Sequence, residues 1–513
     1  DVYVKFANIV TFNNDLTTGR SSTTNFSPYV GSTSFGGNVR LGEESDNTFY
    51  ADVNFLNSTE LTFGNNSVSR VTGGTGVYHN IVLEEGASVT WANGNGNTYN
   101  NIRLTRFNTI ELDAGHLSVI NGTFTVNGNC SNWLIVRSSM QGNQAQLQFS
   151  NSQTWTRPAV QDLHVVDGSA VLHISNATAL QNLSDTDASD GSATISINNQ
   201  SSRVYYWTGA GSNNNWGNPA NWSTTSGTPQ PGNQCIPGPL DNVVFDNASF
   251  NGPSTVVIDA ANASCFNLRF QIDEPVTLTT TSFNNRILVY NDLVWSNLIT
   301  NNFTGTFEFQ SVTRFEGASP QTNVLRNRDG GPITFSGSVE FHADQIMPEG
   351  NWQLNHVMDI NDGLPHDVYL ASFTLVSGAF NANQQNISLE GGFSIEHTAR
   401  FFYNNNGLGN NAAGGGQTVI FDGNQQLVDI LNRNDNIPNP FFNILINKAS
   451  PGRNVVIRSQ GFSMANDLTI QQGRFWDSNQ GSNGIGEAPY AINGTGTITI
   501  ADNGTLLLGD NEE

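Results

Sequence analysis

Charged residues are scarce in this chain, and basic residues are the scarcest. Only 12% of the 513 residues are charged, and 20 Lys and Arg stand against 43 Asp and Glu, which gives a net charge of −23. Nucleic acids and anionic membranes are bound through clusters of Lys and Arg. The composition therefore excludes both as expected partners. The acidic balance favours solubility, and carboxylates could also recruit divalent cations.

Membrane spans and catalytic motifs are missing as well. No apolar run approaches the roughly 20 residues that a helix needs to cross a bilayer. The G-x-S-x-G elbow, HExxH and the Walker A loop are absent, and the 8 histidines are scattered. Neighbouring carboxylates, such as Glu84 and Glu85, would point to opposite faces of a strand. We therefore expect neither an enzyme nor a bound organic cofactor.

Cysteine is rare, with 3 residues, at positions 130, 235 and 265. None has a C-x-x-C or Cys/His spacing typical of a zinc site. The chain begins with Asp1 and without a signal peptide, and its last unit has no capping helix. We expect a segment of a larger protein.

The abundant residues are those of short strands joined by polar turns. The chain contains 51 Gly, its aromatics make up 10%, and it is too long for one ordinary core. From about residue 61, short runs of alternating apolar and polar residues end in Gly, Asn or Asp. Alternation with period two predicts strands buried on one face, and the Gly and Asn stops predict left-handed corners.

Internal repeats decide between a sandwich, a barrel and a solenoid. Repeated units that cannot bury a face alone stack into a continuous core, and their spacing predicts a parallel β-helix-like solenoid with about 20–25 residues per coil. We expect aliphatic residues and Phe inside, and ladders of stacked Asn side chains where the recurring Asn lies. The repeated lines are YHNIVLEE (78–85), YNNIRLTR (99–106), CFNLRF (265–270) and FFNILINK (441–448), then DNVVFDN (241–247), GPITFSG (331–337) and QTVIFDG (417–423).

The fold class we predict is all-β, with tandem β-solenoid modules that each have a head rich in Trp, Pro and Gly. Residues 1–202 form module one, which is truncated at its N-terminus. Residues 203–270 form the head of module two and hold three tryptophans and two cysteines. Residues 271–513 form the coils of module two.

Three stretches resemble large secreted surface proteins of Bacteroidota, which are cargo of type IX secretion and include gliding-motility adhesins. They are the head YYWTGAGSNNNWGNPANWS with the CIPGPLDNVVFDNASF and VVIDAANASCFNLRF that follow it, the block NCSNWLIVRSSMQGNQAQLQF before VQDLHVV, and the coil type FFNILINKAS…NDLTIQQGRF. Together they cover most of the chain beyond about residue 75. The C-terminal sorting domain of such proteins is not visible here, so the secretion route follows from the resemblance alone.

The resemblance implies an extracellular, cell-surface location, with the type IX machinery and surface-anchoring proteins as partners. It also implies that Cys235 and Cys265 lie close together, and a disulfide between them would suit such a location. Two reduced, buried thiols are the alternative. Cys130 has no evident partner, and we interpret it as a small core residue.

The head offers two candidate ligand sites. Trp207, Trp216 and Trp222 either stack on sugar rings or, as we favour, seal the open end of the coil stack. Oxygen ligands for calcium could come from two groups of aspartates, which otherwise act as turn formers and strand-end caps. Neither group has EF-hand spacing. The groups are Asp241, Asp246 and Asp259, and Asp185, Asp187 and Asp190.

These features predict a structural and adhesive segment of a large secreted fibre or adhesin that serves surface attachment or gliding motility. One alternative is a β-helix protein that binds or degrades surface polysaccharides, which would need Trp, Asp and Arg gathered in a groove. A second alternative is a passive spacer within a larger surface protein.

Overall fold

The chain is almost entirely β-structure in the computed structural model. The sole helical turn in the described part is η1 (Pro219–Asn221), and no helix there is long and apolar enough to cross a membrane. The structure describes residues 2–508 apart from positions 7–9, 13, 21, 29–31, 50–51, 56–58, 73–75, 93–95, 131–133, 141, 167–169, 178, 186–194, 200–202, 231–234, 260–261, 312–321, 330–332, 344–350, 355–366, 383–385, 396–398, 403–417, 433–440, 458–463, 465 and 478–495.

Residues 2–199, here called the first solenoid, wind through ladders of parallel strands. One ladder contains β1 (Val2–Phe6), β4 (Thr23–Pro28), β7 (Asp46–Phe49), β10 (Val68–Val71), β12 (Ser88–Trp91), β14 (Asn108–Leu112), β17 (Leu134–Ser138), β20 (Pro158–Val165) and β22 (Ala179–Asp185). The next contains β2 (Val10–Phe12), β5 (Ser32–Phe35), β8 (Asp52–Phe55), β11 (Val77–Leu83), β13 (Asn97–Leu104), β15 (Leu117–Ile120) and β18 (Ala145–Phe149). The remaining strands are β3 (Leu16–Thr17), β6 (Val39–Leu41), β9 (Glu60–Phe63) and β16 (Phe124–Thr125), then β19 (Gln153–Thr156), β21 (Leu172–Ala177) and β23 (Ile195–Asn199).

Residues 204–508, the second solenoid, form sheets of 9, 3 and 13 strands. The first contains β24 (Val204–Trp207), β25 (Trp222–Ser223), β26 (Asn242–Asp246), β29 (Leu268–Gln271), β32 (Leu293–Trp295), β35 (Asn323–Asn327), β37 (Trp352–Leu354), β39 (Ala379–Asn381) and β42 (Arg400–Phe402). The second contains β27 (Ser254–Ile258), β30 (Val276–Thr280) and β33 (Ile299–Asn301). The third contains β28 (Asn262–Cys265), β31 (Arg286–Val289), β34 (Thr306–Ser311), β36 (Ile333–Ala343), β38 (Asp367–Leu375), β40 (Asn386–Leu389), β41 (Phe393–Ile395), β43 (Thr418–Phe421), β44 (Leu427–Asn432), β45 (Asn443–Asn447), β46 (Asn454–Ile457), β47 (Leu468–Asp477) and β48 (Ile498–Leu508).

The repeats seen in the sequence stack on one another in register. Tyr78 pairs with Tyr99, and Asn80 with Asn101, so the first two repeated lines form neighbouring coils. Four hydrogen bonds between coils among residues 18–101 join residues 21 to 24 positions apart, within the predicted coil length, whereas bonds between later coils of this solenoid span up to 31 positions. The predicted all-β solenoid class is confirmed.

Alternation along each strand sends every second side chain into the interior. In β36 the inward residues are buried and the residues between them are exposed or half-buried. The inward residues collect in two large hydrophobic clusters, one spanning residues 35–177 and the other reaching from Tyr205 to Phe475. The exact limits of the head and of its coils stay a prediction.

Asparagine ladders connect successive coils, as predicted. Asn101 Nδ2 donates to Asn80 Oδ1 at 2.8 Å. In the second solenoid Asn291 Nδ2 donates to Asn267 Oδ1 at 2.9 Å, and Asn466 Nδ2 donates to Asn443 Oδ1 at 2.9 Å. An amide offers both a donor and an acceptor, so one Asn can bond the coils above and below it.

At one corner of the first solenoid, successive coils each have a residue in the left-handed backbone conformation. Only two of these four residues are Gly or Asn. The residues have φ of 51° at Glu44, 53° at Asn66, 75° at Gly86 and 53° at Phe107. Hydrogen bonds between successive coils hold the backbone in this turn, although a positive φ is a strained conformation for a bulky residue such as Phe. The expectation of Gly or Asn at every such corner was too narrow.

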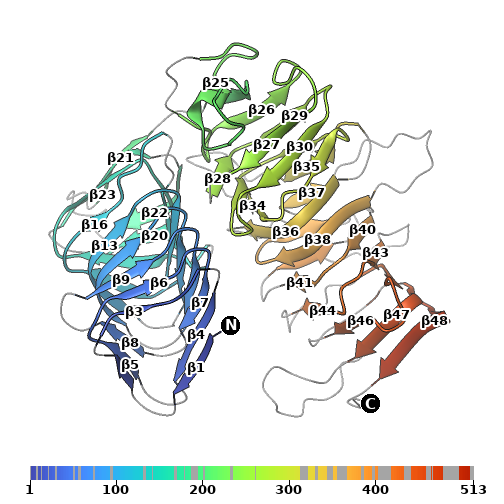
Figure 1. The fold of residues 1–513 in the computed structure, drawn as a ribbon, viewed down its shortest axis with the longest axis horizontal. Helices are drawn as coiled ribbons and strands as arrows, with labels where there is room; N and C mark the ends of the chain where they lie inside the picture. Colours follow the sequence, from blue (N-terminus) through green and yellow to red (C-terminus); the bar gives the residue numbers. More distant parts are fainter. Residues whose placement is uncertain are drawn as a thin grey trace.

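The two solenoids lie side by side rather than end to end. Figure 1 shows that they converge near β21 and β25 and spread apart toward the ends that carry the two termini. The outward face of β14, β17 and β20 therefore comes to lie against the outward face of β31, β34 and β36.

Candidate functional site at the junction of the two solenoids

A small apolar patch marks where the outward faces meet. Ile135 and Ala159 of the first solenoid pack with Leu288 and Tyr290 of the second, and all four are buried. Phe266 packs against their edge. Outward strand positions normally face water, so their burial shows that each solenoid covers part of the other.

Beside this patch lies a group of charged side chains that we call the junction cluster, namely Glu111, Arg137, Arg286, Glu308 and Glu340. Arg137 of β17 reaches across the junction, with Nη1 at 2.9 Å from Glu308 Oε1. Its Nη2 lies 2.6 Å from Glu111 Oε1 in its own solenoid. Arg286 pairs with Glu308 and also, at 3.0 Å, with Glu340. One arginine therefore bridges the two solenoids, and a second bridges two coils.

The ladder register places these residues together. Glu111 pairs with Arg137 on the next coil, and Glu308 pairs with Glu340. Glu111, Glu308 and Glu340 each sit between two inward apolar residues of their strands, and Arg137 follows the inward Val136, so these side chains point outward. Stacking puts Glu308 and Glu340 on the same column, where like charges would repel without the arginines.

Burial and pairing set the charge of the cluster. Burial alone would raise the pKa of Glu308, but the charges of Arg137, Arg286 and His342 outweigh it and hold that pKa below its usual value. Burial likewise opposes ionisation of Glu340, but Arg286 and the hydrogen bond with His342 lower its pKa to about 2. Glu308 and Glu340 are therefore ionised at neutral pH.

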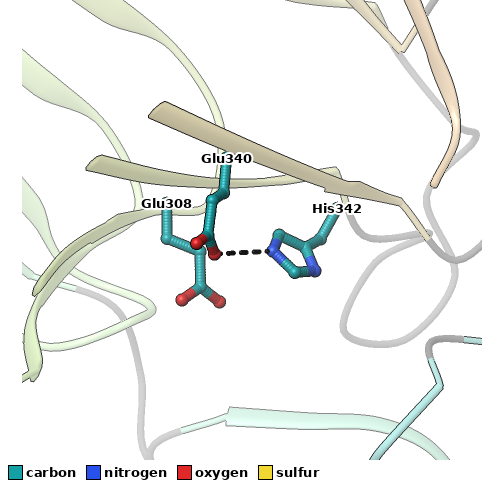
Figure 2. Close-up of side chains that lie close together, drawn as sticks. All are labelled: Glu308, Glu340 and His342. Carbon is teal, nitrogen blue, oxygen red and sulfur yellow. Dashed lines mark hydrogen bonds and ion pairs between the residues drawn. The ribbon is translucent and has the colours of Figure 1, made fainter. Parts of the chain in front are cut away.

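Glu308, Glu340 and His342 bring their ligand atoms within 4.8 Å of one another, the one such group of three in the described part of the chain. Figure 2 shows the three side chains, with His342 Nε2 at 3.3 Å from Glu340 Oε2. Both oxygens of Glu308 already accept from arginine, and Gln310 Nε2 also donates to this carboxylate. A cation would have to displace guanidinium groups, so these residues do not fit a metal site in this arrangement.

The same contacts also keep a substrate from reaching the charged groups at the centre of the cluster. The Glu308 side chain has no exposed surface, and that of Arg137 is only 10% exposed. A polysaccharide-active β-helix protein would need Trp, Asp and Arg gathered in a groove, whereas the first solenoid covers the centre of this cluster. The ion pairs of the cluster instead hold the two solenoids together.

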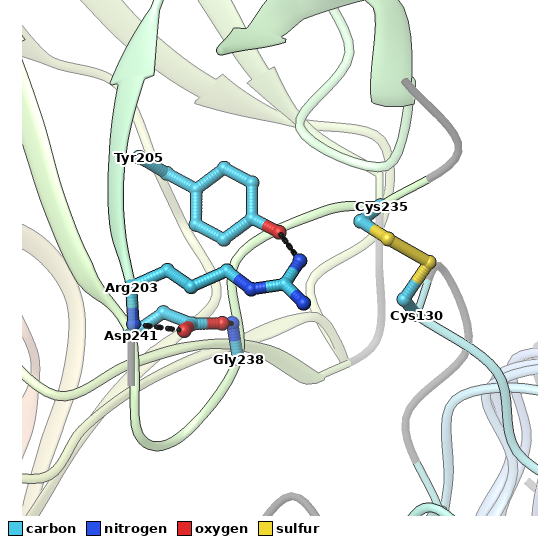
Figure 3. Close-up of a disulfide and its surroundings, with 6 residues drawn as sticks. All are labelled: Cys130, Arg203, Tyr205, Cys235, Gly238 and Asp241. Carbon is cyan, nitrogen blue, oxygen red and sulfur yellow. Dashed lines mark hydrogen bonds between the residues drawn. A yellow bond between two sulfur atoms is a disulfide. The ribbon is translucent and has the colours of Figure 1, made fainter. Parts of the chain in front are cut away.

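The disulfide lies at the same junction, and its pairing differs from the sequence prediction. Cys130 of the first solenoid is bonded to Cys235 of the second, across a sequence separation of 105, as Figure 3 shows. Cys265 is a free, buried thiol whose pKa is raised by burial. The predicted Cys235–Cys265 bond is therefore wrong, as is the interpretation of Cys130 as a core residue without a partner. The fold-back of the second solenoid brings Cys130 to Cys235, while Cys265 points into the core.

Two further contacts reinforce the junction. Phe107, at the left-handed corner, belongs to the buried cluster of the second solenoid rather than to that of the first. The side-chain amide of Asn284 donates to the carbonyl oxygen of Asn66 at 2.7 Å. The left-handed corner thus presents both a side chain and a carbonyl group to the neighbouring solenoid.

The aspartates of the head that were predicted as calcium ligands instead accept hydrogen bonds from backbone N–H groups. Asp241 accepts from the N–H groups of Arg203 at 2.9 Å and Gly238 at 3.0 Å (Figure 3), and burial raises its pKa to about 6. Asp246 and Asp259 lie apart from it. Among the described residues the three do not gather into a metal-ligand group.

Asp246 caps a turn by accepting from Ala248 N at 3.0 Å, and Asp259 accepts from Gly217 N at 2.7 Å. These are the turn-forming and capping roles named as the alternative. The side chain of Asp185, and Asp187 and Asp190 altogether, lie outside the described residues.

The three tryptophans of the head are buried to within 1% exposure. They form edge-on contacts, with Trp222 centred 5.0 Å from Trp207 and 4.8 Å from Trp216, and Trp222 Nε1 donates to Trp216 O at 2.7 Å. β24 and β25 form the first edge of their sheet, so the indoles lie at the end of the stack. Their faces are covered, which suits a cap and leaves none for a sugar.

Comparisons with protein families, curated proteins and solved structures find no match to this chain.

The junction cluster was missed at the sequence level because its members lie far apart in the chain. One local signal was present. All five residues of β17 are buried, in the sequence LIVRS. A strand without alternation is typical of burial on both faces. Such a strand carrying an arginine indicates a buried ion pair with another part of the protein.

Proposed function

We propose that this chain is a structural and adhesive segment of a large secreted cell-surface protein, in which two solenoids are locked side by side. The observation that carries the proposal is the junction cluster. This group of charged side chains joins the solenoids, and its central carboxylate, Glu308, is fully buried.

The cell-surface location is supported by the disulfide between Cys130 and Cys235, because such bonds persist in oxidising compartments. It is also supported by the resemblance to Bacteroidota surface proteins, from which we infer type IX secretion and a role in attachment or gliding. Parallel ladders with stacked amides suit a mechanical role, since neighbouring coils are cross-linked by both backbone and side chains.

Two measurements on the purified chain separate this proposal from its alternatives. Beads coated with the chain are tested on a glycan array and on abiotic surfaces, and the soluble chain is incubated with polysaccharides while new reducing ends are counted. Binding without turnover supports an adhesive segment. Turnover of a polysaccharide would contradict the proposal, and neither binding nor turnover would favour the passive spacer.

A further inference from the structure

One turn of the head exposes an asparagine directly before a glycine. Asn251 and Gly252 lie between β26 and β27, and Asn251 is exposed. Phe250, on one side of the pair, is 7% exposed and stacks on Phe245 with the ring centroids 6.0 Å apart. On the other side, Ser254 begins β27. The turn is therefore anchored at both ends while its asparagine faces solvent.

The backbone nitrogen of Gly252 is neither hydrogen-bonded nor crowded. Among the bonds of the described residues, none is donated by the Gly252 N–H group and none involves the Asn251 side chain. Gly252 has a φ of 138°, which residues with a Cβ rarely adopt. Apart from its chain neighbours, no atom lies within 4 Å of the place where a Cβ would stand. The nitrogen is therefore open to reaction with the side chain that precedes it.

The other Asn–Gly pairs in the described ranges are held by the coils. In the pairs 121–122 and 127–128, the glycine N–H group donates to a carbonyl oxygen of the neighbouring coil, at 2.7 Å to Asn100 and at 2.8 Å to Thr156. The pair 503–504 belongs to the ladder between β47 and β48. A backbone nitrogen in such a ladder reacts only after the coil has opened locally.

We propose that Asn251 is a site of spontaneous deamidation. The nitrogen of Gly252, after losing its proton to hydroxide, attacks Cγ of Asn251. The new bond between these two atoms closes a succinimide ring, and the bond from Cγ to Nδ2 breaks. Nδ2 leaves as ammonia after taking a proton from the solvent. Water then opens the ring at either carbonyl group, which gives aspartate or isoaspartate, and no atom is oxidised or reduced.

The products change the head at a turn that is anchored to its core. Both add a carboxylate to a chain whose net charge is already −23. Isoaspartate also inserts an additional methylene group into the main chain between Phe250 and Ser254. Because Phe250 belongs to the buried cluster of the second solenoid, the longer connection begins at a fixed point of the core. The reaction needs only water, so every copy of the chain undergoes it with time.

Incubation of the full chain in mildly alkaline buffer tests the proposal, because hydroxide removes the proton that must leave first. Mass spectrometry of the digested chain measures the conversion of amide to acid at each site, and chromatography separates aspartate from isoaspartate. Deamidation at Asn251 should be at least about tenfold faster than at Asn121 and Asn127, whose glycines must first leave their hydrogen bonds. In concentrated urea, which unfolds the coils, the three rates should become similar.

Asn251→Gln is the matched control, because glutamine keeps the amide but must close a larger ring, which forms more slowly. This variant should lose the fast reaction, and circular dichroism checks that it remains folded. Equal rates at the three sites in the folded chain, or an unmodified Asn251, would overturn the inference. The same rate ratio in urea as in buffer would also overturn it, since local sequence and not the fold would then select Asn251.

Discussion

The two solenoids share one backbone plan and fill it with different side chains. In the second solenoid, ring contacts run without a break from Trp207 to Phe441, through stacked pairs such as Phe245 and Phe270 with centroids 4.9 Å apart. In the first solenoid, the described ring contacts form smaller groups, such as Tyr78 with Tyr99 at 5.3 Å. Aliphatic residues fill most of the remaining interior of the first solenoid.

Buried polar residues bond to the backbone inside both stacks, and in the second solenoid Asn285 Nδ2 donates to the carbonyl oxygen of Ile258 at 2.8 Å. In the first solenoid, Asn108 Nδ2 donates to the carbonyl oxygen of Ala87 at 3.1 Å, and Asn47 Nδ2 donates to Ser45 Oγ at 2.8 Å. These bonds hold corners from within. In both solenoids the ladder of backbone hydrogen bonds sets the coil, and the interior is filled by whichever side chains stack on themselves.

The largest effect should come from releasing the two solenoids from each other. Replacing Cys130 and Cys235 by Ser opens a loop with a sequence separation of 105. The expected loss is about 4–5 kcal/mol of unfolding free energy, because the unfolded chain regains the entropy that the cross-link removes. Urea unfolding should then show two transitions in place of a coupled one. A single unshifted transition would contradict the coupling, and Cys265→Ser controls for loss of a thiol.

The aromatic column should make the second solenoid more sensitive to loss of a ring. Phe341 contacts Phe309, Trp352 and Phe373 with centroids within 5.2 Å. Phe341→Ala should cost about 3–5 kcal/mol of unfolding free energy. Phe63→Ala in the first solenoid removes the edge-on contact with Trp91 at 6.3 Å and should cost less. Equal costs in urea unfolding would erase the distinction between the two cores.

Breaking the junction cluster should weaken the contact between the solenoids without disturbing either core. Arg137→Ala leaves Glu308 buried with Arg286 as its remaining arginine partner. The expected loss is about 3 kcal/mol of unfolding free energy. This is the lower end of the range for breaking a buried ion pair, because Arg286 still pairs with Glu308. Arg40→Ala, which breaks the more exposed pair with Glu84, is the matched control and should cost less than about 1 kcal/mol.

Acid should act on the same cluster. Glu308 and Glu340 have lowered pKa values in the folded chain, about 2 for Glu340. The unfolded chain therefore takes up protons first as the pH falls below about 4.3. The stability that these carboxylates contribute is present above that pH and is lost toward pH 2. Urea unfolding between pH 5 and 2 should show a weaker pH dependence in Arg137→Ala, and an unchanged dependence would contradict this assignment.

The smallest effect should come from the asparagine ladders. Asn101→Ala removes the bond to Asn80 and the acceptor for Thr123 N at 2.9 Å. The expected cost is about 1 kcal/mol, since the site is only partly buried. Asn151→Ala, at an exposed position whose amide donates to Asn121 O, is a control expected to cost less. A larger loss in the control would show that the ladders contribute nothing particular to coil stacking.

Local patterns were enough to predict the coil architecture. Period-two alternation in HNIVLEE and NNIRLTR gave the strands, and the repeated Asn gave the ladder between Asn80 and Asn101. The crowding of Trp residues among Gly and Pro turns predicted a cap, and the indoles at the end of the second stack are buried. Each of these features depends on residues within one coil or on the next.

Features that join distant coils could not be predicted in the same way. The pairing of Cys130 with Cys235, and of Arg137 with Glu308, depends on the second solenoid lying beside the first. Coil repeats carry no information on that fold-back, because the contact uses outward residues that vary from coil to coil. The pairing of Cys235 with Cys265 that the resemblance implied was therefore wrong.

The most direct test of the side-by-side arrangement is to map the disulfide. The unreduced chain is alkylated under denaturing conditions, digested and analysed by mass spectrometry. The structure predicts a cross-linked peptide pair that contains Cys130 and Cys235, with Cys265 recovered in alkylated form. A peptide pair that joins Cys235 to Cys265, or three alkylated cysteines, would contradict the account.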